Sequence, residues 1–356
     1  GGNDGRPYSF GRPSSGGSKA AYPCKSYGQG RINPAYFYGV FDPNDMRRDV
    51  SITMTGSNGK GVEKLIPFVP NSKAEGGGLT LNKWDENRQA NPWVAAQRKS
   101  GINGPYMRMS EVYLGYAEVC AALGDVVTGK QYLKTVRERS FPQGLANTDA
   151  FIASFGNDLV RAIIEERGFE YAGEGDRRWT LIRSGYLPDD IKRIKDMTKA
   201  MMDGLATKGY YEFENGNIIS AYIWTKLVDS KTIYGHRLTA QCPTDKVNDP
   251  VLYPGWRGQK DNWEEMGLNY GSSTPATNLA IKGLFEIVSE EEAASLESQG
   301  YTKVNWGIDL VDNRDEYDKY LFWDYDYVSA PIYLWPFTPN VMAAGGFTNG
   351  YGFKQE

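Results

Sequence analysis

A run of alternating acids and bases is the part of this sequence best suited to chemistry. Residues 160–183 carry an amphipathic helical pattern that leads through a Glu-Gly-Asp-Arg-Arg turn into a second short helix. Helical spacing places the charged side chains within one or two turns of each other. We expect a network of buried ion pairs, which marks a fold and performs no reaction. Its predicted members are Glu166, Arg167, Glu170, Glu174, Arg177, Arg178 and Arg183, the last three reaching back from the second helix.

The sequence contains few residues in patterns suited to catalysis. His236 is the only histidine, so the sequence predicts neither a histidine-based triad nor a zinc site. Asp324 and Asp326 would share one face of a strand, as a glycosidase requires, but a chain with 44 acids contains such pairs by chance. The aspartates of residues 309–315 lack the glycine and the final glutamate of a calcium loop. The sequence therefore predicts a protein that is not an enzyme and holds no metal or cofactor.

The composition limits the kinds of partner that the protein is expected to bind. A net charge of −4, with no dense basic run, argues against nucleic acid. The three cysteines are far apart and imply no disulfide framework. No apolar run approaches the length of a membrane-spanning helix. The chain holds 24 tyrosines and 9 tryptophans, and these rings serve either as packing or as exposed stacking platforms.

The elements around the charged run are mostly helices. Residues 105–123 and 127–139 are expected to form a tetratricopeptide-like hairpin, with Ala117 and Gly129 where its helices cross. An apolar stripe on the first helix is expected to face a core, and it consists of Met109, Val112, Tyr113, Tyr116, Ala117, Cys120 and Leu123. Further helices are predicted from about residue 148, from about residue 157, over 188–207, and from a capping box at Ser289 to Gly300.

Strands are expected to be few and short. A hairpin is predicted over residues 209–224, turning at Asn215-Gly216. Residues 42–49 are read as a turn with capping acids, followed by a strand over 50–55. The first thirty residues and residues 235–275 are rich in loop-forming residues.

Five segments together resemble the RagB/SusD family. The charged run is similar to its Glu-Arg-x-x-Glu…Glu-Gly-x-Arg hallmark, which here has Gly168 where a second arginine is usual and Thr180 where an aspartate is usual. The other four segments follow the family's order, and they are 42–48 (an Asp-x-Arg turn), 106–118 and 132–139 (two helices), and 334–340 with 349–351 (the closing motif).

The resemblance implies a mainly α, SusD-like fold with tetratricopeptide-like helical hairpins, long irregular loops and a few small strands. It implies one domain over residues 1–356 that lacks the family's usual N-terminal helices, so that the sequence corresponds to the C-terminal part of a member. Residues 186–330 are expected to form a long variable insertion. The two departures suggest an ion network thinner than usual.

The resemblance also implies a function. Family members are non-catalytic lipoproteins of the outer membrane and cell surface that serve polysaccharide utilisation. They capture a glycan and deliver it to a TonB-dependent transporter of the SusC type. The alternative is a peptide-binding or structural lid subunit of that transporter. The membrane would be reached only through an N-terminal lipid that this sequence does not contain.

Sugar capture needs rings for the C–H face of a pyranose and polar side chains for its hydroxyls. Two regions supply that mixture, the N-terminal loop and the predicted insertion. The candidate glycan-binding residues are Tyr22, Tyr27, Arg31, Tyr36, Trp224, Trp256 and Trp263.

Overall fold

Helices predominate in the structure. A computed structural model describes residues 30–57, 63–66, 68, 78–84, 105–229, 277–315 and 337–346. The strands within this part are few, short and antiparallel, which confirms the predicted mainly helical class. None of the helices among these residues combines the length and the apolar character that a membrane crossing requires.

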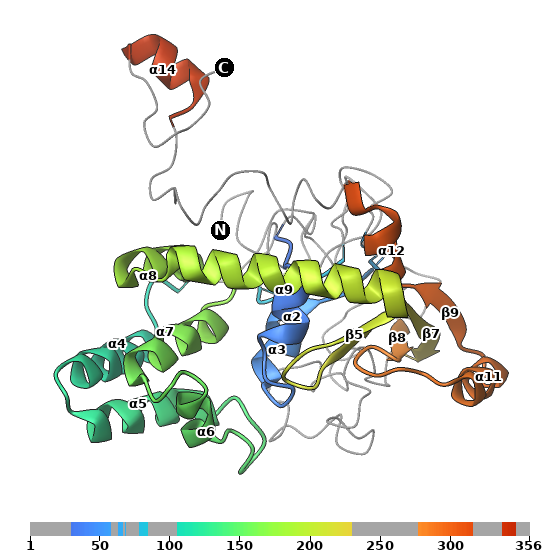
Figure 1. The fold of residues 1–356 in the computed structure, drawn as a ribbon, viewed down its shortest axis with the longest axis horizontal. Coiled ribbons are helices and arrows are strands. Elements are labelled where there is room, and N and C mark those ends of the chain that lie inside the picture. The colour runs from blue at the N-terminus through green and yellow to red at the C-terminus, as the bar shows by residue number, and fades with distance from the viewer. Residues whose placement is uncertain are drawn as a thin grey trace, which may run out of the picture.

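Successive helices gather on one side of the molecule, and the last of them runs from there across to the other side (Figure 1). They are α4 (Met109–Ala122), α5 (Val126–Glu138), α6 (Thr148–Ala153), α7 (Leu159–Glu170), α8 (Asp176–Ser184) and α9 (Leu187–Lys208). Aspartate or asparagine side chains cap α5, α6 and α7 by accepting backbone N–H groups, as loop-to-helix boundaries favour. The predicted hairpin crossing is confirmed, because a Cβ atom on Gly129 would lie 3.0 Å from the Ala117 carbonyl oxygen.

The expected inward stripe on α4 is largely wrong. Leu114, Ala117 and Cys120 face the core. Four of the seven predicted residues lie on the outer side of the helix, where Met109, Val112, Tyr116 and Leu123 are exposed beside Val119. The helix therefore carries two apolar faces, and periodicity alone does not show which one is buried.

The region 34–57 also differs from its prediction. The chain forms α2 (Pro34–Gly39) and α3 (Met46–Ser51), so the expected turn over 42–49 contains the start of a helix. Asp45 caps α3 by accepting the Arg47 N–H at 3.0 Å, which is why this acid-rich stretch becomes helical. The expected strand is broken into β1 (Ile52–Thr53) and β2 (Thr55–Ser57), which pair with different partners.

The described residues also form four small antiparallel sheets. β1 pairs with β4 (Thr80–Leu81), and β2 with β3 (Glu63–Leu65). β5 (Tyr210–Glu212) and β6 (Ile218–Ser220) form the predicted hairpin. β7 (Tyr222–Asp229) lies between β8 (Thr277–Lys282) and β9 (Thr302–Asn305). The remaining helices of the described part are α11 (Glu290–Ser298), which Ser289 caps as predicted, α12 (Gly307–Asp312) and α14 (Pro339–Gly345).

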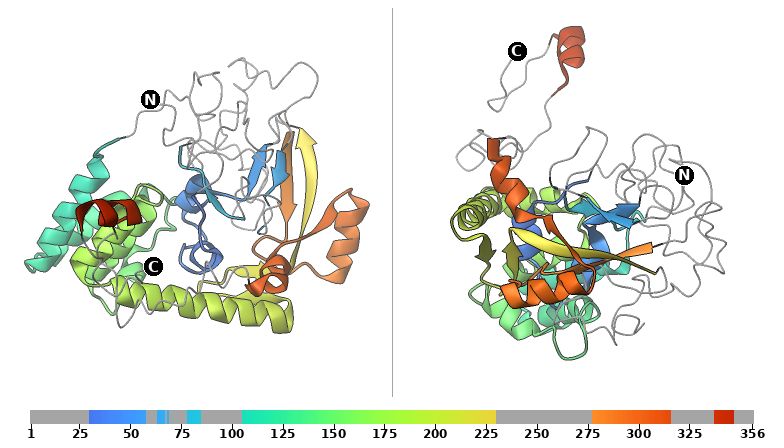
Figure 2. Two further views of the ribbon diagram at one scale, coloured as in Figure 1. Left: turned by 90° about the horizontal axis from the view of Figure 1, so that it is seen from above. Right: turned by 90° about the vertical axis from the view of Figure 1, so that its right-hand side faces the viewer.

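The two largest hydrophobic cores of the described residues meet at α7. An aliphatic core joins α4, α5 and α7 around Leu114, Leu133 and Ile163. A second core, rich in aromatic rings, joins α2, α9 and the strands and includes Phe169 at the end of α7. Figure 2 shows the helical hairpins on one side, the β7 sheet on the other, and α2 and α3 between them. α7 thus contributes to both cores, and its charged residues lie at their junction.

Candidate functional site

The acids of α7 form the centre of a buried ion cluster, the ion-paired seam. Glu166 is fully buried and lies 2.6 Å from Arg47 Nη1 and 3.0 Å from Arg137 Nη1. Glu170 is 3% exposed and lies 2.6 Å from Arg108 Nη1, with Arg139 as a second close partner. Charged side chains leave water at a high cost, and several charge-assisted hydrogen bonds to each carboxylate offset that cost here.

The seam keeps the Glu170 carboxylate ionised. Burial alone would raise the pKa of Glu170, but the charge of Arg47 and the charges and hydrogen bonds of Arg139 and Arg108 lower that pKa to about 2. Such a group does not exchange a proton near neutral pH, so it is unsuited to general acid–base catalysis. The seam is therefore a structural device.

A second ion cluster lies on the neighbouring face of the same helix. Glu165 is 2% exposed and pairs with Arg177 at 2.8 Å and Arg193 at 2.9 Å. Asp190, on α9, accepts from the same two guanidinium groups. Burial opposes ionisation of Asp190, yet the charges of Arg177 and Arg193 lower its pKa below the ordinary value. This cluster ties α7, α8 and α9 together.

The two departures from the family's hallmark both lie beside buried arginines. A Cβ atom on Gly168 would lie 2.8 Å from Arg177 Nη1, so the glycine leaves room for the guanidinium that bonds Glu165 and the Ile164 carbonyl. Thr180 accepts a hydrogen bond from Arg167 Nε at 3.2 Å. Arg167 Nη2 also bonds Asp176, at 2.6 Å.

Arg177 and Arg183 of α8 pair outside the seam. Arg177 reaches Glu165, and Arg183 reaches Glu118 of α4 through Nη2 at 2.8 Å. Arg178 is half-buried on α8. The cations that bond Glu166, Glu170 and Glu174 come from elsewhere in the chain, and they are Arg47, Lys83, Arg108, Arg137 and Arg139.

Sequence reasoning missed these partners although a signal existed. The three motif segments at 42–48, 106–118 and 132–139 each contain one or two of these arginines. Spacing within one helix shows which side chains share a face, but it does not show which distant cations reach that face.

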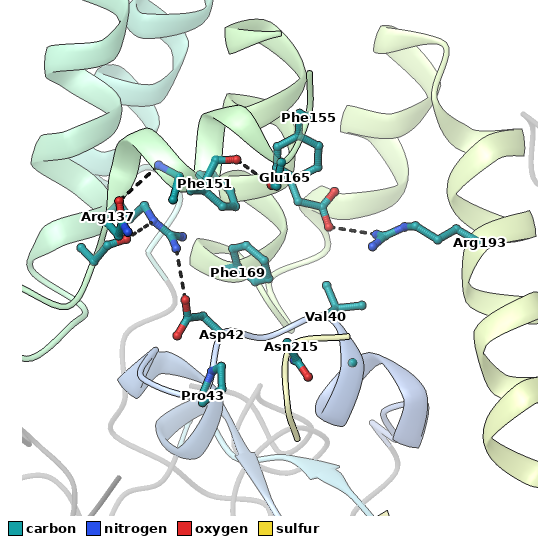
Figure 3. A pocket seen from close by; sticks show the side chains of 15 residues that line it. Val40, Asp42, Pro43, Arg137, Phe151, Phe155, Glu165, Phe169, Arg193 and Asn215 are labelled. Atoms are coloured by element: carbon teal, nitrogen blue, oxygen red, sulfur yellow. Dashed lines mark hydrogen bonds and ion pairs between the residues drawn. The ribbon is translucent and has the colours of Figure 1, made fainter. Parts of the chain in front are cut away.

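A cavity of about 390 Å³ opens beside the seam, and we call it the α6 pocket. In Figure 3, Phe169 lies in the middle of its lining, with Asp42 and Arg137 on one side and Glu165 and Arg193 on the other. The lining residues come from the α2–α3 connection, α5 to α7, α9 and the β5–β6 turn, and they are Gly39, Val40, Asp42, Pro43, Arg137, Ala146, Asn147, Ala150, Phe151, Ser154, Phe155, Glu165, Phe169, Arg193 and Asn215. Its volume lies in the range of about 300–1,000 Å³ typical of small-molecule sites.

The rings of the α6 pocket form an aromatic cluster. Phe151 and Phe155 meet edge to face, with their centroids 5.2 Å apart, and the Phe151 and Phe169 centroids are 6.2 Å apart. The guanidinium carbon of Arg137 lies 3.8 Å from the Phe151 centroid. Phe169 is buried and forms the floor, whereas Phe155 is half-buried and lies nearer to solvent.

The predicted glycan-binding residues do not come together in the described part. Tyr22, Tyr27, Trp256 and Trp263 lie outside the described residues. Arg31 is exposed, and its backbone pairs with Thr80.

The structure argues against the two remaining rings as sugar platforms. Trp224 is 6% exposed, because it packs under the turn after β8, where a Cβ atom on Gly283 would lie 3.5 Å from its ring. Tyr36 is half-buried and packs edge to face on Phe41, with their centroids 5.5 Å apart. Burial raises the pKa of the Tyr36 hydroxyl above its ordinary range. An apolar run in the sequence does not reveal that both faces of a strand are covered.

The described part of the chain contains no cluster of side chains suited to binding a metal ion. No group of three or more histidine, cysteine, aspartate or glutamate side chains among these residues could hold an ion. Asp309 belongs to no such group among these residues. Its carboxylate accepts a hydrogen bond from the Asn305 amide at 3.1 Å.

Comparisons with known proteins agree on one family. The sequence model of the SusD family matches residues 3–336. The chain is similar to SusD-like protein P25 of Formosa agariphila, with 29% identity over 160 residues. That alignment covers 45% of this chain and 26% of the relative, so the chain spans only a small part of the relative's length. No solved structure matches the chain significantly.

Proposed function

Because this chain belongs to the SusD family, we propose that it is a glycan-binding protein of the outer-membrane surface that serves nutrient uptake. It captures oligosaccharide or polysaccharide without changing it chemically and delivers it to a TonB-dependent transporter of the SusC type. The observation that carries this proposal is the family match, which runs continuously from the residues before α2 to the residues after α12.

The state of the α7 acids supports binding without catalysis. Glu166 and Glu170 are each held between two or more cations, and the pKa of Glu170 is about 2. Glu170 is therefore not poised to donate a proton to a leaving group, as a glycosidase requires.

The proposed glycan contacts lie mainly in the loops. Tyr22 and Tyr27 of the N-terminal loop and Trp256 and Trp263 of the insertion would offer ring faces to pyranose C–H groups. We assign specificity to the insertion, residues 186–330, within a single domain over residues 1–356. Trp224 and Tyr36 are not retained as contacts, since packing covers them.

The outer face of α4 favours a second role, that of a structural lid. Its exposed apolar side chains recur with alternating steps of three and four residues, at Met109, Val112, Tyr116, Val119 and Leu123. A narrow stripe with this period is typical of a helix that packs against another helix. Such a face suits docking on a partner protein better than it suits sugar.

Affinity gel electrophoresis tests the proposed function. The chain is run through native gels that contain one soluble polysaccharide each, beside Tyr27→Ala, Trp256→Ala and the control Tyr106→Ala. Tyr106 is fully exposed and lies outside both proposed loops, so its loss should change nothing. We expect one polysaccharide to retard the wild type and the control, and to retard at least one loop variant less.

Two outcomes would count against this proposal. Retardation of none of the proteins by any polysaccharide would argue against glycan capture and favour a peptide ligand or the lid role. Equal retardation of all four proteins would keep glycan capture but remove Tyr27 and Trp256 from the binding site.

A further inference from the structure

We propose that the α6 pocket binds a single neutral pyranose residue of the captured glycan. This proposal rests on the proposed function but concerns a different place, because the predicted stacking residues lie in other segments. The charge of the lining, its rings and its unused polar atoms all favour such a ligand.

The charge of the lining points to a neutral ligand. Two carboxylates, Asp42 and Glu165, face two guanidinium groups, Arg137 and Arg193. Arg137 is already bonded to Glu166 at 3.0 Å, and Glu165 to Arg193 at 2.9 Å. An anion or a cation would meet no uncompensated opposite charge here, and a charged ligand would lose its hydration without a partner.

The rings suit a ligand that has one apolar face. Phe151, Phe155 and Phe169 supply an aromatic wall and floor, to which Val40 adds an aliphatic edge. A pyranose presents C–H groups on its faces and hydroxyls around its edge, so it can lie on a ring while its hydroxyls reach the rim. An entirely apolar ligand would leave the polar groups of the rim without partners.

The rim holds polar atoms that the fold leaves unused. The Asn147 side-chain oxygen caps α6 by accepting from Ala150 N at 3.2 Å, while its amide NH₂ has no acceptor among the described residues. The buried Nε of Arg193 likewise has no acceptor there. Asp42 accepts from Asn44 N through one oxygen, and its other oxygen is 3.8 Å from Arg137 Nη2. Hydroxyl groups of a sugar both accept from such donors and donate to such a carboxylate.

Asn147 has an unfavourable backbone conformation. Its φ of 36° lies in the left-handed region, which non-glycine residues seldom adopt. This conformation holds the residue at the mouth of the pocket, between the α5–α6 connection and α6. Asn147→Gly therefore removes the side chain with little effect on the backbone, because glycine tolerates this φ and is a nearly equivalent helix N-cap.

The experiment uses saturation-transfer NMR with methyl β-D-glucopyranoside, methyl β-D-galactopyranoside and methyl α-D-mannopyranoside at millimolar concentrations. We expect ring C–H protons of at least one glycoside to receive saturation from the wild type. Phe155→Ala should lower the affinity about tenfold, since it removes the outer ring. Asn147→Gly should lower it about threefold through loss of the amide donor, and the control Tyr106→Ala should leave it unchanged.

The outcomes separate this proposal from the proposed function. Absence of glycoside binding to the wild type, or equal binding to the wild type and to both pocket variants, overturns the pocket proposal, and retardation by a polysaccharide would still support glycan capture. Glycoside binding that depends on Phe155 and Asn147, without retardation by any polysaccharide, supports the pocket and counts against capture of glycan chains. Thermal unfolding of each variant shows whether it is folded, and Asn147→Gly keeps the test valid if Phe155→Ala does not fold.

Discussion

The ion-paired seam and the α6 pocket both border α7, yet they use their polar groups in opposite ways. In the seam, Glu166 and Glu170 each bond at least two cations, and their carboxylates are buried. In the pocket, the Asn147 amide and the Arg193 Nε have no acceptor among the described residues. The charged groups of the seam find their partners within the protein, whereas some polar atoms of the pocket do not.

This difference separates stability from binding. A saturated cluster of buried charges fixes the elements that supply it, here α3, α5 and α7, because the loss of any member leaves a charge unpaired. Unused donors beside exposed ring surface favour a ligand that completes them. We therefore expect substitutions in the seam to change unfolding and substitutions in the pocket to change affinity.

Glu166→Gln should have the largest effect on stability. The substitution keeps the shape of the side chain but removes the charge that compensates Arg137 and Arg47, and Arg137 is 2% exposed. Loss of one partner from a buried ion pair typically costs about 3–5 kcal/mol of unfolding free energy. Urea unfolding followed by circular dichroism measures this change, and a loss below about 1 kcal/mol would show that the seam is not a stability device.

Acid should weaken the seam through Glu170. Its folded-state pKa of about 2 lies below the ordinary value of 4.5, so its contribution is complete above pH 4.5 and is lost as the pH falls towards 2. The shift corresponds to about 3 kcal/mol. The free energy of unfolding of wild type should therefore fall more steeply between pH 5 and pH 2 than that of Glu170→Gln. Parallel curves for the two proteins would contradict the assigned pKa.

Glu118→Gln should have the smallest effect. Glu118 pairs with Arg183 at 2.8 Å, but Arg183 is about half exposed, and water screens the pair. Surface ion pairs contribute between about 0 and 1 kcal/mol. This variant removes the same charge as Glu166→Gln in the same urea experiment, so it isolates the effect of burial. Equal losses from both variants would mean that burial does not set the strength of these pairs.

The sequence predicted the class of fold and the charged residues of α7, but not how they pair. The segment from Glu166 to Glu174 lies near the junction of the two cores, as its mixture of apolar and charged residues suggests. Its cations come from up to about 120 residues away, for example Arg47 bonding Glu166 across 119 positions. Helical periodicity is local and carries no information on such contacts.

Two errors have a common physical cause. Four residues of the predicted α4 stripe are exposed although their spacing predicts a core face, and Trp224 is buried although the sequence makes it a candidate glycan contact. The apolar character of a residue does not show which neighbour covers it, since neighbours come from distant segments. The α6 pocket escaped prediction for the same reason, because Asp42, Phe151 and Asn215 meet only in the fold.

Amide hydrogen exchange in the presence and absence of a bound glycoside or polysaccharide tests the separation of stability and binding most directly. We predict that the ligand slows exchange most in residues 147–155, which border the α6 pocket, and slows residues 166–170 of α7 by no more than the ligand adds to the global free energy of unfolding. Slower exchange in residues 166–170 with no change in 147–155 would contradict the account.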